Sequence, residues 1–358
     1  MSSKGSALRW DGVDLMDDVD FMDGVDHCGS LAQIPSSIQE EKLMQPTICQ
    51  RLTVTAVLMT VLAVLPGVAQ TASLAPASAN PVNHTIVFMT DFGEVDDSVA
   101  ICKAVMLRLD PAVRIMDITH QVKPYSILDG SRFLAGTSPY YGPGTVFVAV
   151  IDPGVGSSRK AIVARSKLGQ YFVAPDNGLL TVIEDRDGIA EAREIKNTEW
   201  MVGNNVSSTF HGRDIFSPVG AHLARGDDWT QVGPVIEKIV RLDVRPAMLE
   251  AAGLSGEVIA TDGPYGNLIT NIEAAQFLQL GFRTGDLVHF TVTGKPYTMR
   301  FVHTFSDVPR GRPLLYIDSR GRLAIAVNQA NAASMLHVNP PVRLLIPRKS
   351  AATSRAGP

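Results

Sequence analysis

The sequence predicts an α/β protein in which an N-terminal domain with a parallel sheet precedes a smaller C-terminal antiparallel β domain. Continuous runs of β-branched and apolar residues, of which Thr145–Ile151 is the clearest, suit strands that are buried on both faces of a parallel sheet. Between residues 85 and 151 such runs alternate with segments of helical period, in the β-α-β-α-β order of a helix-covered sheet. Beyond about residue 250 the pattern changes to short alternating segments separated by Gly, Pro and Asn, which is typical of a small sandwich or barrel.

Composition sets the broad class of the protein. The chain has 358 residues, of which 45% are hydrophobic and 19% charged, with a net charge of −4. This is an ordinary globular composition with room for two domains. The charge balance favours neither nucleic acid nor an anionic membrane surface as a partner. If the N-terminal region is removed, Cys102 is the single remaining cysteine, so no intramolecular disulfide is expected.

The first 84 residues do not have the pattern of the folded domains. Residues 1–43 are acidic and irregular, and we interpret them as an extension of the gene model or a disordered segment. From Met44 the character changes, because Arg51 is followed by the apolar run Leu52–Leu65 and then by small residues. Such an order predicts a signal peptide over residues 44–79, and the apolar run is short for a membrane span. We therefore expect export, to a periplasm, and no membrane association after cleavage.

The first folded domain is expected over residues 85–245. It begins with a short apolar strand, Thr85–Thr90, and a helix follows in which apolar residues keep helical spacing as far as Leu109. Pro111 ends that helix, and a linker around Val240–Pro246 closes the domain. The other expected elements are the strands Val113–Ile118, Thr145–Ile151 and Ala192–Lys196, the hairpin of Ala161–Arg165 with Tyr171–Ala174, and helices at Ile127–Ala135, Leu179–Ile183 and Ile215–Arg225.

The second folded domain is expected over residues 250–347, followed by a disordered tail at 349–358. Two of its loops, Gly263–Asn267 and Ser319–Gly321, are rich in hydrogen-bonding groups. Its expected strands are Gly256–Asp262, Asp286–Val292, Tyr297–Phe301, Pro313–Ile317, Leu323–Val327 and Val342–Ile346.

A carboxylate stands at the end of the third expected strand. Asp152 follows that strand directly, Pro153 and Gly154 stop it, and Arg159 comes seven residues after Asp152. Ligands of open α/β sheets bind beyond the carboxyl ends of the strands. Taken alone, an Asp-Pro-Gly sequence also fits a simple turn cap.

Two further residues are candidates on position alone. Asp91 ends the first strand beside a helix start, where it would accept hydrogen bonds from a ribose diol or else serve as an N-cap. His211 stands in a turn that opens a helix, where a structural histidine is the default. The cluster of Asp91, Glu94, Asp96 and Asp97 would suit a cation, although acidic residues at a helix start are favoured by the helix dipole anyway. The sequence has no Cys or His cluster with the spacing of a zinc site, no phosphate-binding loop and no Gly-x-Ser-x-Gly nucleophile elbow.

Five ordered motifs give a more specific indication. Together they resemble the S-adenosylmethionine hydroxide adenosyltransferase family, the hydrolytic relatives of the fluorinases and chlorinases. The resemblance covers about residues 85–347 and leaves out residues 1–84. The motifs are Thr90-Asp91-Phe92-Gly93, Asp152-Pro153-Gly154-Val155-Gly156-Ser157, Pro175-Asp176-Asn177-Gly178-Leu179-Leu180, Phe210-His211-Gly212-Arg213-Asp214 and Asn267-Leu268-Ile269-Thr270-Asn271.

The resemblance implies a reaction and a catalytic group. Asp152, Arg159 and His211 match a water-activating triad, so the expected reaction is hydrolysis of S-adenosyl-L-methionine to adenosine and L-methionine by attack on C5′ of the ribose. Gly212 stands where halogenases have a halide-contacting serine. The sulfonium is already a cationic leaving group, so neither a metal nor a cofactor is expected. Holding the oxygen nucleophile in line with C5′ supplies much of the rate enhancement. Either Arg159 with Asp152 stabilises hydroxide, or His211 accepts the proton.

The resemblance also implies how the substrate is held. Asp91 with Ser98 nearby would hold the ribose hydroxyls, and Tyr125 would form an aromatic wall. The family's site lies between the first domain of one subunit and the second domain of its neighbour, so a homotrimer is expected. The remaining implied contacts are Asp96 and Asp262 with the methionine ammonium, Ser319 and Arg320 with its carboxylate, and Asn267 and the backbone near Ala330 with adenine, whereas Val327 replaces an arginine of the halogenases.

Two alternative functions fit parts of the sequence. A chlorinase-like halide-dependent transferase would share the fold, but Asp152, His211 and Gly212 differ from the halogenase pattern. An exported protein that binds adenosine or S-adenosylmethionine without turnover would explain the signal peptide, but it would not need the triad.

Overall fold

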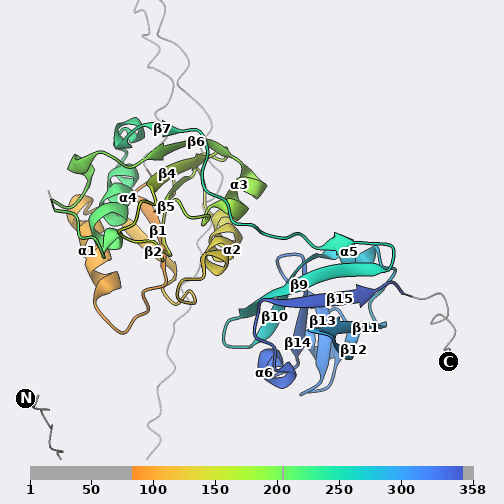
Figure 1. The fold of residues 1–358 in the computed structure, drawn as a ribbon. Coiled ribbons are helices and arrows are strands. Elements are labelled where there is room, and N and C mark those ends of the chain that lie inside the picture. The colour runs from red at the N-terminus through yellow and green to blue at the C-terminus, as the bar shows by residue number, and fades with distance from the viewer. Residues whose placement is uncertain (1–82, 204, 350–358) are drawn as a thin grey trace, which may run out of the picture. The chain divides into compact units, whose positions relative to one another are not determined.

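The computed structural model describes residues 83–203 and 205–349, which contain an α/β domain and a β-barrel domain (Figure 1). The fold class expected from the sequence is therefore confirmed. The expected extension and signal peptide lie outside the described residues, as does the tail beyond Lys349. Within the described ranges, no helix is both long and apolar enough to cross a membrane.

The α/β domain is built on a seven-stranded mixed sheet with the order β2-β1-β3-β5-β4-β6-β7. Neighbouring strands from β2 to β5 run parallel, and β4, β6 and β7 continue the sheet in antiparallel pairs. The expected hairpin is present as the β4–β5 pair. The strands are β1 (Thr85–Thr90), β2 (Arg114–Thr119), β3 (Val146–Val150), β4 (Ala161–Ser166), β5 (Tyr171–Pro175), β6 (Ile189–Glu194) and β7 (Val235–Ile236).

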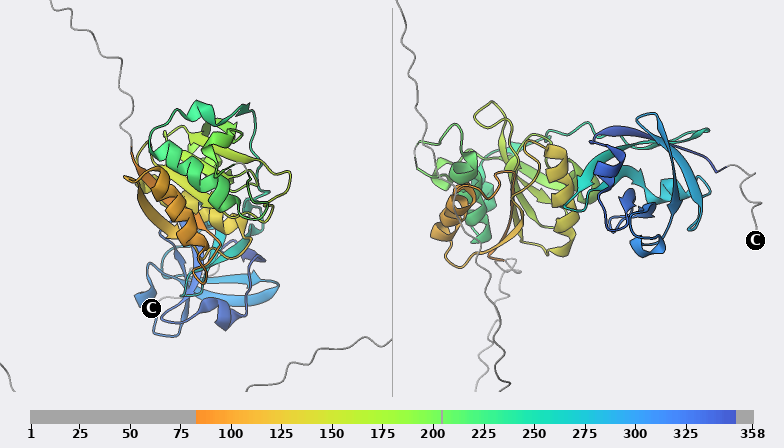
Figure 2. Two further views of the ribbon diagram at one scale, coloured as in Figure 1. Left: turned by 90° about the vertical axis from the view of Figure 1, so that its left-hand side faces the viewer. Right: turned by 90° about the horizontal axis from the view of Figure 1, so that it is seen from below.

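Helices cover both faces of this sheet, as Figure 2 shows. Side chains of α1 and α4 pack with Val146, Val148 and Val150 of β3. The alternate residues Phe147 and Ala149 pack against α2 and α3 on the opposite face. Because both faces are covered, every β3 side chain is buried, which explains its unbroken apolar run. The helices are α1 (Ser98–Leu109), α2 (Ile127–Thr137), α3 (Thr181–Asp187) and α4 (Ser217–Ala224), with short helical turns η1 (Ser138–Tyr140), η2 (Thr198–Trp200), η3 (Gly212–Phe216) and η4 (Trp229–Val232).

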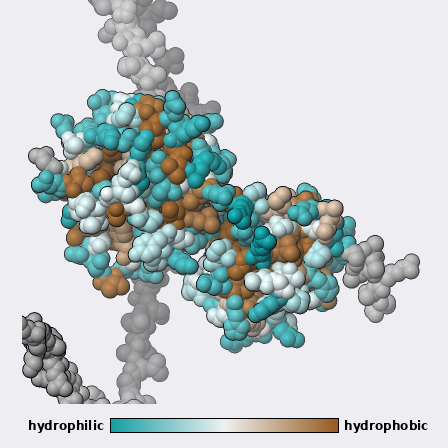
Figure 3. Space-filling model, viewed as in Figure 1, coloured by the Kyte–Doolittle hydropathy of each residue, from teal (hydrophilic) through white to brown (hydrophobic). Residues whose placement is uncertain are grey.

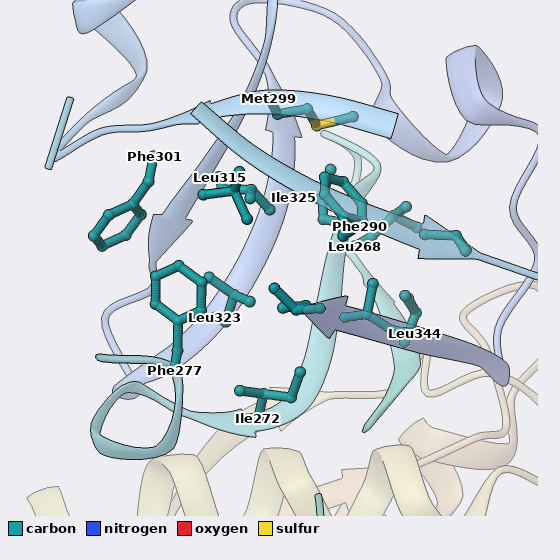
Figure 4. Close-up of a cluster of buried hydrophobic side chains, with 14 of the residues drawn as sticks. Leu268, Ile272, Phe277, Phe290, Met299, Phe301, Leu315, Leu323, Ile325 and Leu344 are labelled. Atoms are coloured by element: carbon teal, nitrogen blue, oxygen red, sulfur yellow. The ribbon is translucent and has the colours of Figure 1, made fainter. Parts of the chain in front are cut away.

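The second domain is a sheet with the strand order β10-β14-β13-β12-β11-β15-β9-β8, closed into a barrel because β10 also pairs with β9. Its interior is filled by apolar side chains, among them Phe277, whose ring meets that of Phe301 edge-on at 4.8 Å (Figure 4). The elements are β8 (Met248–Leu249), β9 (Gly253–Asp262), β10 (Asn267–Glu273), α5 (Ala274–Leu278), β11 (Leu287–Val292), β12 (Lys295–Phe301), η5 (Phe305–Asp307), β13 (Pro313–Ile317), β14 (Arg322–Val327), α6 (Ala332–Leu336) and β15 (Val342–Pro347).

The elements that the sequence analysis did not expect have physical explanations. β10 does not alternate, because it pairs on both sides and has its first four residues buried. Its register shifts after Ile269, where Thr270 turns its hydroxyl to the carbonyl of Leu323 at 2.6 Å. The helix expected at Ile215–Arg225 is preceded by a π-helical turn, η3, that begins at Gly212.

Most of the molecular surface drawn in Figure 3 mixes hydrophilic and hydrophobic residues in both domains, as is usual for folded proteins. Among the large hydrophobic side chains, Val95 is fully exposed, and Tyr125 is 74% exposed. Val95 lies in the loop after β1, between the candidate residues Asp91 and Asp96 in the sequence, and Tyr125 lies in the loop after β2, where its backbone N–H bonds to Asp91. These loops are therefore the part of the α/β domain where apolar surface remains uncovered beside candidate site residues.

Candidate active site

The end of β3 is fixed so that Asp152 projects from the edge of the sheet. The side chain of Asn177 donates to the carbonyl of Ile151 at 2.9 Å, and the backbone then turns with Val155 N–H bonded to the Asp152 carbonyl at 3.2 Å. Gly156 has φ +75° and packs against the backbone of Ser208 so closely that a β-carbon has no space there. This tight turn brings Arg159 back to Asp152.

Asp152, Arg159 and His211 form one hydrogen-bonded cluster. The Nε of Arg159 lies 2.9 Å and 3.0 Å from the two carboxylate oxygens of Asp152, and one Nη also contacts that carboxylate. The same Nη lies 2.6 Å from Nδ1 of His211. The side chains of Asp152 and Arg159 are 5% and 10% exposed, and the guanidinium lies 5.2 Å from the ring centre of Phe216. The structure therefore brings together all three residues of the expected triad.

The contact with Arg159 determines which nitrogen of His211 carries the proton. A guanidinium only donates hydrogen bonds, so Nδ1 must be the acceptor and Nε2 carries the proton of the neutral ring. Burial lowers the pKa of His211 below its ordinary value, and the positive charge of Arg159 lowers it further. A neutral ring whose free lone pair is already engaged can donate through Nε2 but has no acceptor left for a proton from water. Of the two mechanisms left open by the sequence, this geometry favours the hydroxide held by the cluster.

The turn that carries His211 is held from two directions. His211 precedes the π-helical turn η3, in which the carbonyl of Phe210 accepts from the backbone N–H groups of Arg213 and Asp214, both at 3.2 Å. π-helical turns are frequent at functional sites. Gly212 lies against the ring of Phe92, and a β-carbon at Gly212 would lie 2.8 Å from Cζ of that ring. Glycine is therefore required at 212 as long as Phe92 keeps its position.

Asp91 lies in the same cavity but does not cap α1. Its Oδ2 accepts a hydrogen bond from the backbone N–H of Tyr125 at 2.8 Å, whereas α1 begins at Ser98 after Asp97. Tyr125 holds a positive φ of 67°, which directs its N–H toward Asp91. Burial raises the pKa of Asp91, and the nearby charge of Asp152 adds to this increase. The N-cap alternative is thus wrong, and Asp91 remains a candidate ligand-binding carboxylate.

A cavity of about 340 Å³ joins these residues at the carboxyl ends of β1 and β3. Four of the candidates, Asp91, Tyr125, Asp152 and His211, line it, and Arg159 lies behind them. Asp96 and Ser98 do not line it, and Asp96 instead accepts from the Ser98 backbone N–H at 2.9 Å. The sequence analysis missed the cavity residues Phe92, Pro124, Val150, Val155, Thr209 and Phe210, although Phe92, Val155 and Phe210 stand inside its motifs.

A second, larger cavity of about 1040 Å³ is lined mostly by barrel residues. Asn267 opens β10 and pairs with Asp262 at the end of β9, so the two side chains belong to one hairpin end. The turn with Ser319 and Arg320 is held because Oδ1 of Asp318 accepts from the Arg320 N–H at 2.9 Å. All five barrel residues expected at the site line this cavity: Asp262, Asn267, Ser319, Arg320 and Ala330. Val327 lines it too, and the sequence analysis missed Tyr265, Phe305, Tyr316, Asn328 and Asn331.

The acidic loop after β1 gives no metal centre. Over the described parts of the chain, no group of three or more His, Cys, Asp or Glu side chains is arranged to hold a metal ion. Within the loop, Glu94 accepts a hydrogen bond from the side chain of Gln121 at 3.3 Å.

An α/β domain with a buried Asp–Arg–His cluster at its strand ends, followed by a β barrel, is the architecture of a two-domain enzyme. Residues 86–233 match the SAM hydroxide adenosyltransferase N-terminal domain, and residues 256–344 match the SAM hydroxide adenosyltransferase C-terminal domain. The chain belongs to the SAM hydroxide adenosyltransferase family, as the resemblance of its motifs indicated.

Named relatives include both hydrolases and halogenases. The chain is 40% identical to an (R)-S-adenosyl-L-methionine hydrolase of Salinispora tropica, over 73% of this chain and 97% of that protein. It is 33% identical to a fluorinase of an Actinoplanes species, over 72% of this chain and 94% of that protein. Among solved structures, an uncharacterized conserved protein from Thermotoga maritima superposes with a TM-score of 0.70 at 42% identity, covering 73% of this chain and 99% of that one.

Proposed function

We propose that this protein hydrolyses S-adenosyl-L-methionine to adenosine and L-methionine. The observation that carries the proposal is the hydrogen-bonded cluster of Asp152, Arg159 and His211 beside a cavity that also contains Asp91. Relatives at 40% and 35% identity that are named (R)-S-adenosyl-L-methionine hydrolases support it. Of the alternatives, a binder without turnover would not explain why two charged side chains and a histidine are kept together in a largely buried position.

In the proposed reaction, hydroxide attacks C5′ of the ribose. A C5′–oxygen bond forms and the C5′–sulfur bond breaks, and its electron pair neutralises the sulfonium to the thioether of methionine. The proton lost by water passes to the solvent. Arg159 contributes positive charge that favours hydroxide over water. The Nε2–H of His211 donates a hydrogen bond to that hydroxide. Asp152 keeps the guanidinium in place. Because methionine leaves as a neutral thioether, the step needs no metal, cofactor or general acid.

The contact between Gly212 and Phe92 supports hydrolysis over halogenation. A serine hydroxyl at 212, the halide contact of the halogenase pattern, would require the Phe92 ring to move, because even a β-carbon would lie 2.8 Å from it. No observation favours the chlorinase-like alternative.

For the sulfonium configuration, we propose a preference for the (R) epimer, as the names of the hydrolase relatives state for those proteins. The configuration at sulfur does not alter the bond that breaks. It alters where the methyl and 3-amino-3-carboxypropyl groups lie relative to the adenosine. Discrimination would therefore depend on the residues proposed for the methionine group, Asp96, Asp262, Ser319 and Arg320. Incubation with an epimer mixture, followed by chiral chromatography of the remaining substrate, tests this preference.

We further propose that a homotrimer completes each site from the α/β domain of one subunit and the barrel of its neighbour. The two groups of candidate residues line separate cavities, and the apolar side chain of Tyr125 is exposed at the first cavity. In this assembly Asp91 would hold the ribose, and Asn267 with the backbone at Ala330 would hold adenine. Light scattering and a dilution series of activity test it, because a monomer with full activity would contradict it.

Export to a periplasm, directed by residues 44–79, is also a proposal. It rests on the basic residue, apolar run and small-residue exit in that segment. Amino-terminal sequencing of the protein recovered from its native cells tests it, and a mature protein that retains residues 44–79 would contradict it.

The decisive experiment for the reaction is turnover in water enriched in ¹⁸O. Attack on C5′ predicts that adenosine carries one ¹⁸O and methionine carries none, as measured by mass spectrometry. A parallel incubation in saturating chloride is expected to give the same product. Release of 5′-chloroadenosine would favour the halogenase alternative, and no consumption of either epimer would favour the binder.

A further inference from the structure

A chain of polar side chains runs from the surface of the α/β domain to the turn that carries Asp91. At its centre is His120, a 3%-exposed histidine just after β2. Its Nδ1 lies 2.9 Å from Oγ1 of the fully buried Thr90, at the end of β1. Its Nε2 lies 3.1 Å from Oδ1 of Asp117, in a geometry bent away from the ideal hydrogen-bond line. The second oxygen of Asp117 accepts from Nζ of Lys103 at 2.6 Å.

The directions of these bonds follow from the chemistry of the groups. Burial alone would raise the pKa of Asp117, but hydrogen bonds from Lys103 and His120 outweigh it and lower that pKa, so Asp117 is an ionised acceptor. The negative charge of Asp117, 3.1 Å from Nε2, favours the tautomer of His120 with its proton on Nε2, although the geometry is not that of a hydrogen bond, and Nδ1 then accepts from the Thr90 hydroxyl. The Thr90 oxygen in turn accepts from the backbone N–H of Phe92 at 3.3 Å.

His120 also holds the same turn through its backbone. Its carbonyl accepts from the N–H of Gly93 at 2.7 Å, and Gly93 has φ +76°. The turn from Thr90 to Gly93 is thus fixed at its start by the imidazole and at its end by the carbonyl of one residue. Asp91 and Phe92, the two residues between these fixed points, both line the cavity.

We propose that His120 is a positioning residue that sets the Asp91 carboxylate and the Phe92 ring for the substrate, an inference that rests on the proposed function. His120 is not among the residues that line the cavity. It acts through Thr90, and through Phe92 it also reaches Gly212 beside His211. Its loss should therefore weaken binding of the adenosine group more than it slows the chemical step.

The test compares His120→Ala with His120→Asn. The shorter asparagine side chain can still place its amide oxygen near the position of Nδ1 and accept from Thr90. Loss of a hydrogen bond that orients a ligand group predicts an increase of about tenfold in KM and in the Kd of adenosine for the alanine variant. kcat should change by less than about threefold, and the asparagine variant should recover most of the affinity. Calorimetry with adenosine needs no turnover, so this readout stays informative if the proposed reaction fails.

Two further variants separate positioning from general stability. His222 is a matched control, because it is a partly buried histidine paired with Asp227 at 2.6 Å and stacked on Trp200, and it does not line the cavity. His222→Ala should lower the melting temperature without changing adenosine affinity. Thr90→Val keeps the side-chain shape and removes the hydroxyl, so it should reproduce the KM effect of His120→Ala even if that variant folds poorly. The proposal is overturned if adenosine affinity is unchanged in both the His120→Ala and Thr90→Val variants, or if kcat falls as much as affinity.

Discussion

The two cavities are built from the same kinds of polar groups but hold them differently. In the α/β domain, the side chains of Asp152, Arg159 and His211 form hydrogen bonds with one another, and the cavity beside them is about 340 Å³. In the barrel, Ser319 and Arg320 stand on an exposed turn that is held by hydrogen bonds from backbone N–H groups to the Asp318 side chain, beside a cavity of about 1040 Å³. Side chains that are held before substrate arrives suit the stabilisation of a developing charge. Exposed side chains that become ordered only when the ligand binds contribute to affinity less the cost of that ordering.

This contrast predicts that variants of the two cavities separate turnover from affinity. The largest effect is expected for His211→Ala, which removes the proposed Nε2–H donor and leaves Arg159 bound to Asp152. Turnover should fall about 10²–10³-fold, the usual effect of deleting one oxyanion donor. The Kd of adenosine should change less than about twofold, as measured by calorimetry. Equal loss of turnover and affinity would mean that His211 only supports the fold.

The matching variant in the barrel is Arg320→Ala. Its guanidinium is the proposed partner of the methionine carboxylate, and a charge-assisted hydrogen bond contributes about 1.5–3 kcal/mol, or roughly 10–100-fold in KM. Adenosine has no carboxylate, so its affinity should stay constant, and kcat should change little. Steady-state kinetics beside adenosine calorimetry checks both. An unchanged KM would place the carboxylate elsewhere.

A third variant tests whether the contact between Gly212 and Phe92 favours water over chloride as the nucleophile. Gly212→Ser forces a side chain against Phe92, so it should lower hydrolysis about tenfold and stability by about 1–3 kcal/mol. The double variant with Phe92→Ala opens the space and should recover the stability. Thermal unfolding and product analysis with chloride measure the two effects. Full activity of Gly212→Ser alone would show that Phe92 moves without cost.

The sequence predicted those parts of the fold and site that depend on local pattern. The continuous apolar run of β3 and the turn after Asp152 identified the buried strand end, because burial on both faces leaves a recognisable composition. β10 was missed because its pairing with β9 and β14 buries it without alternation. The role of Phe92 was missed for a different reason, since it depends on the contact of its ring with Gly212, 120 positions later in the chain. The tautomer of His211 likewise depends on a hydrogen bond between residues far apart in sequence.

The smallest expected effect is on the pH dependence, and it also tests the proton assignment in the α/β cavity. The pKa of His211 is lowered by burial and by Arg159, so the ring stays neutral through its ordinary pKa of about 6.5 and is protonated only at lower pH. Protonation would place a second positive charge beside Arg159 and remove the Nδ1 acceptor, so kcat/KM should fall as pH decreases through that lowered pKa. His211 itself should therefore titrate below pH 6.5, as measured by NMR of its ring, while kcat/KM also rises with pH for as long as the held water is still being converted to hydroxide. A His211 titration above pH 6.5 would mean that a negative partner holds the proton on the ring, and the assignment of Nδ1 as acceptor would then be wrong.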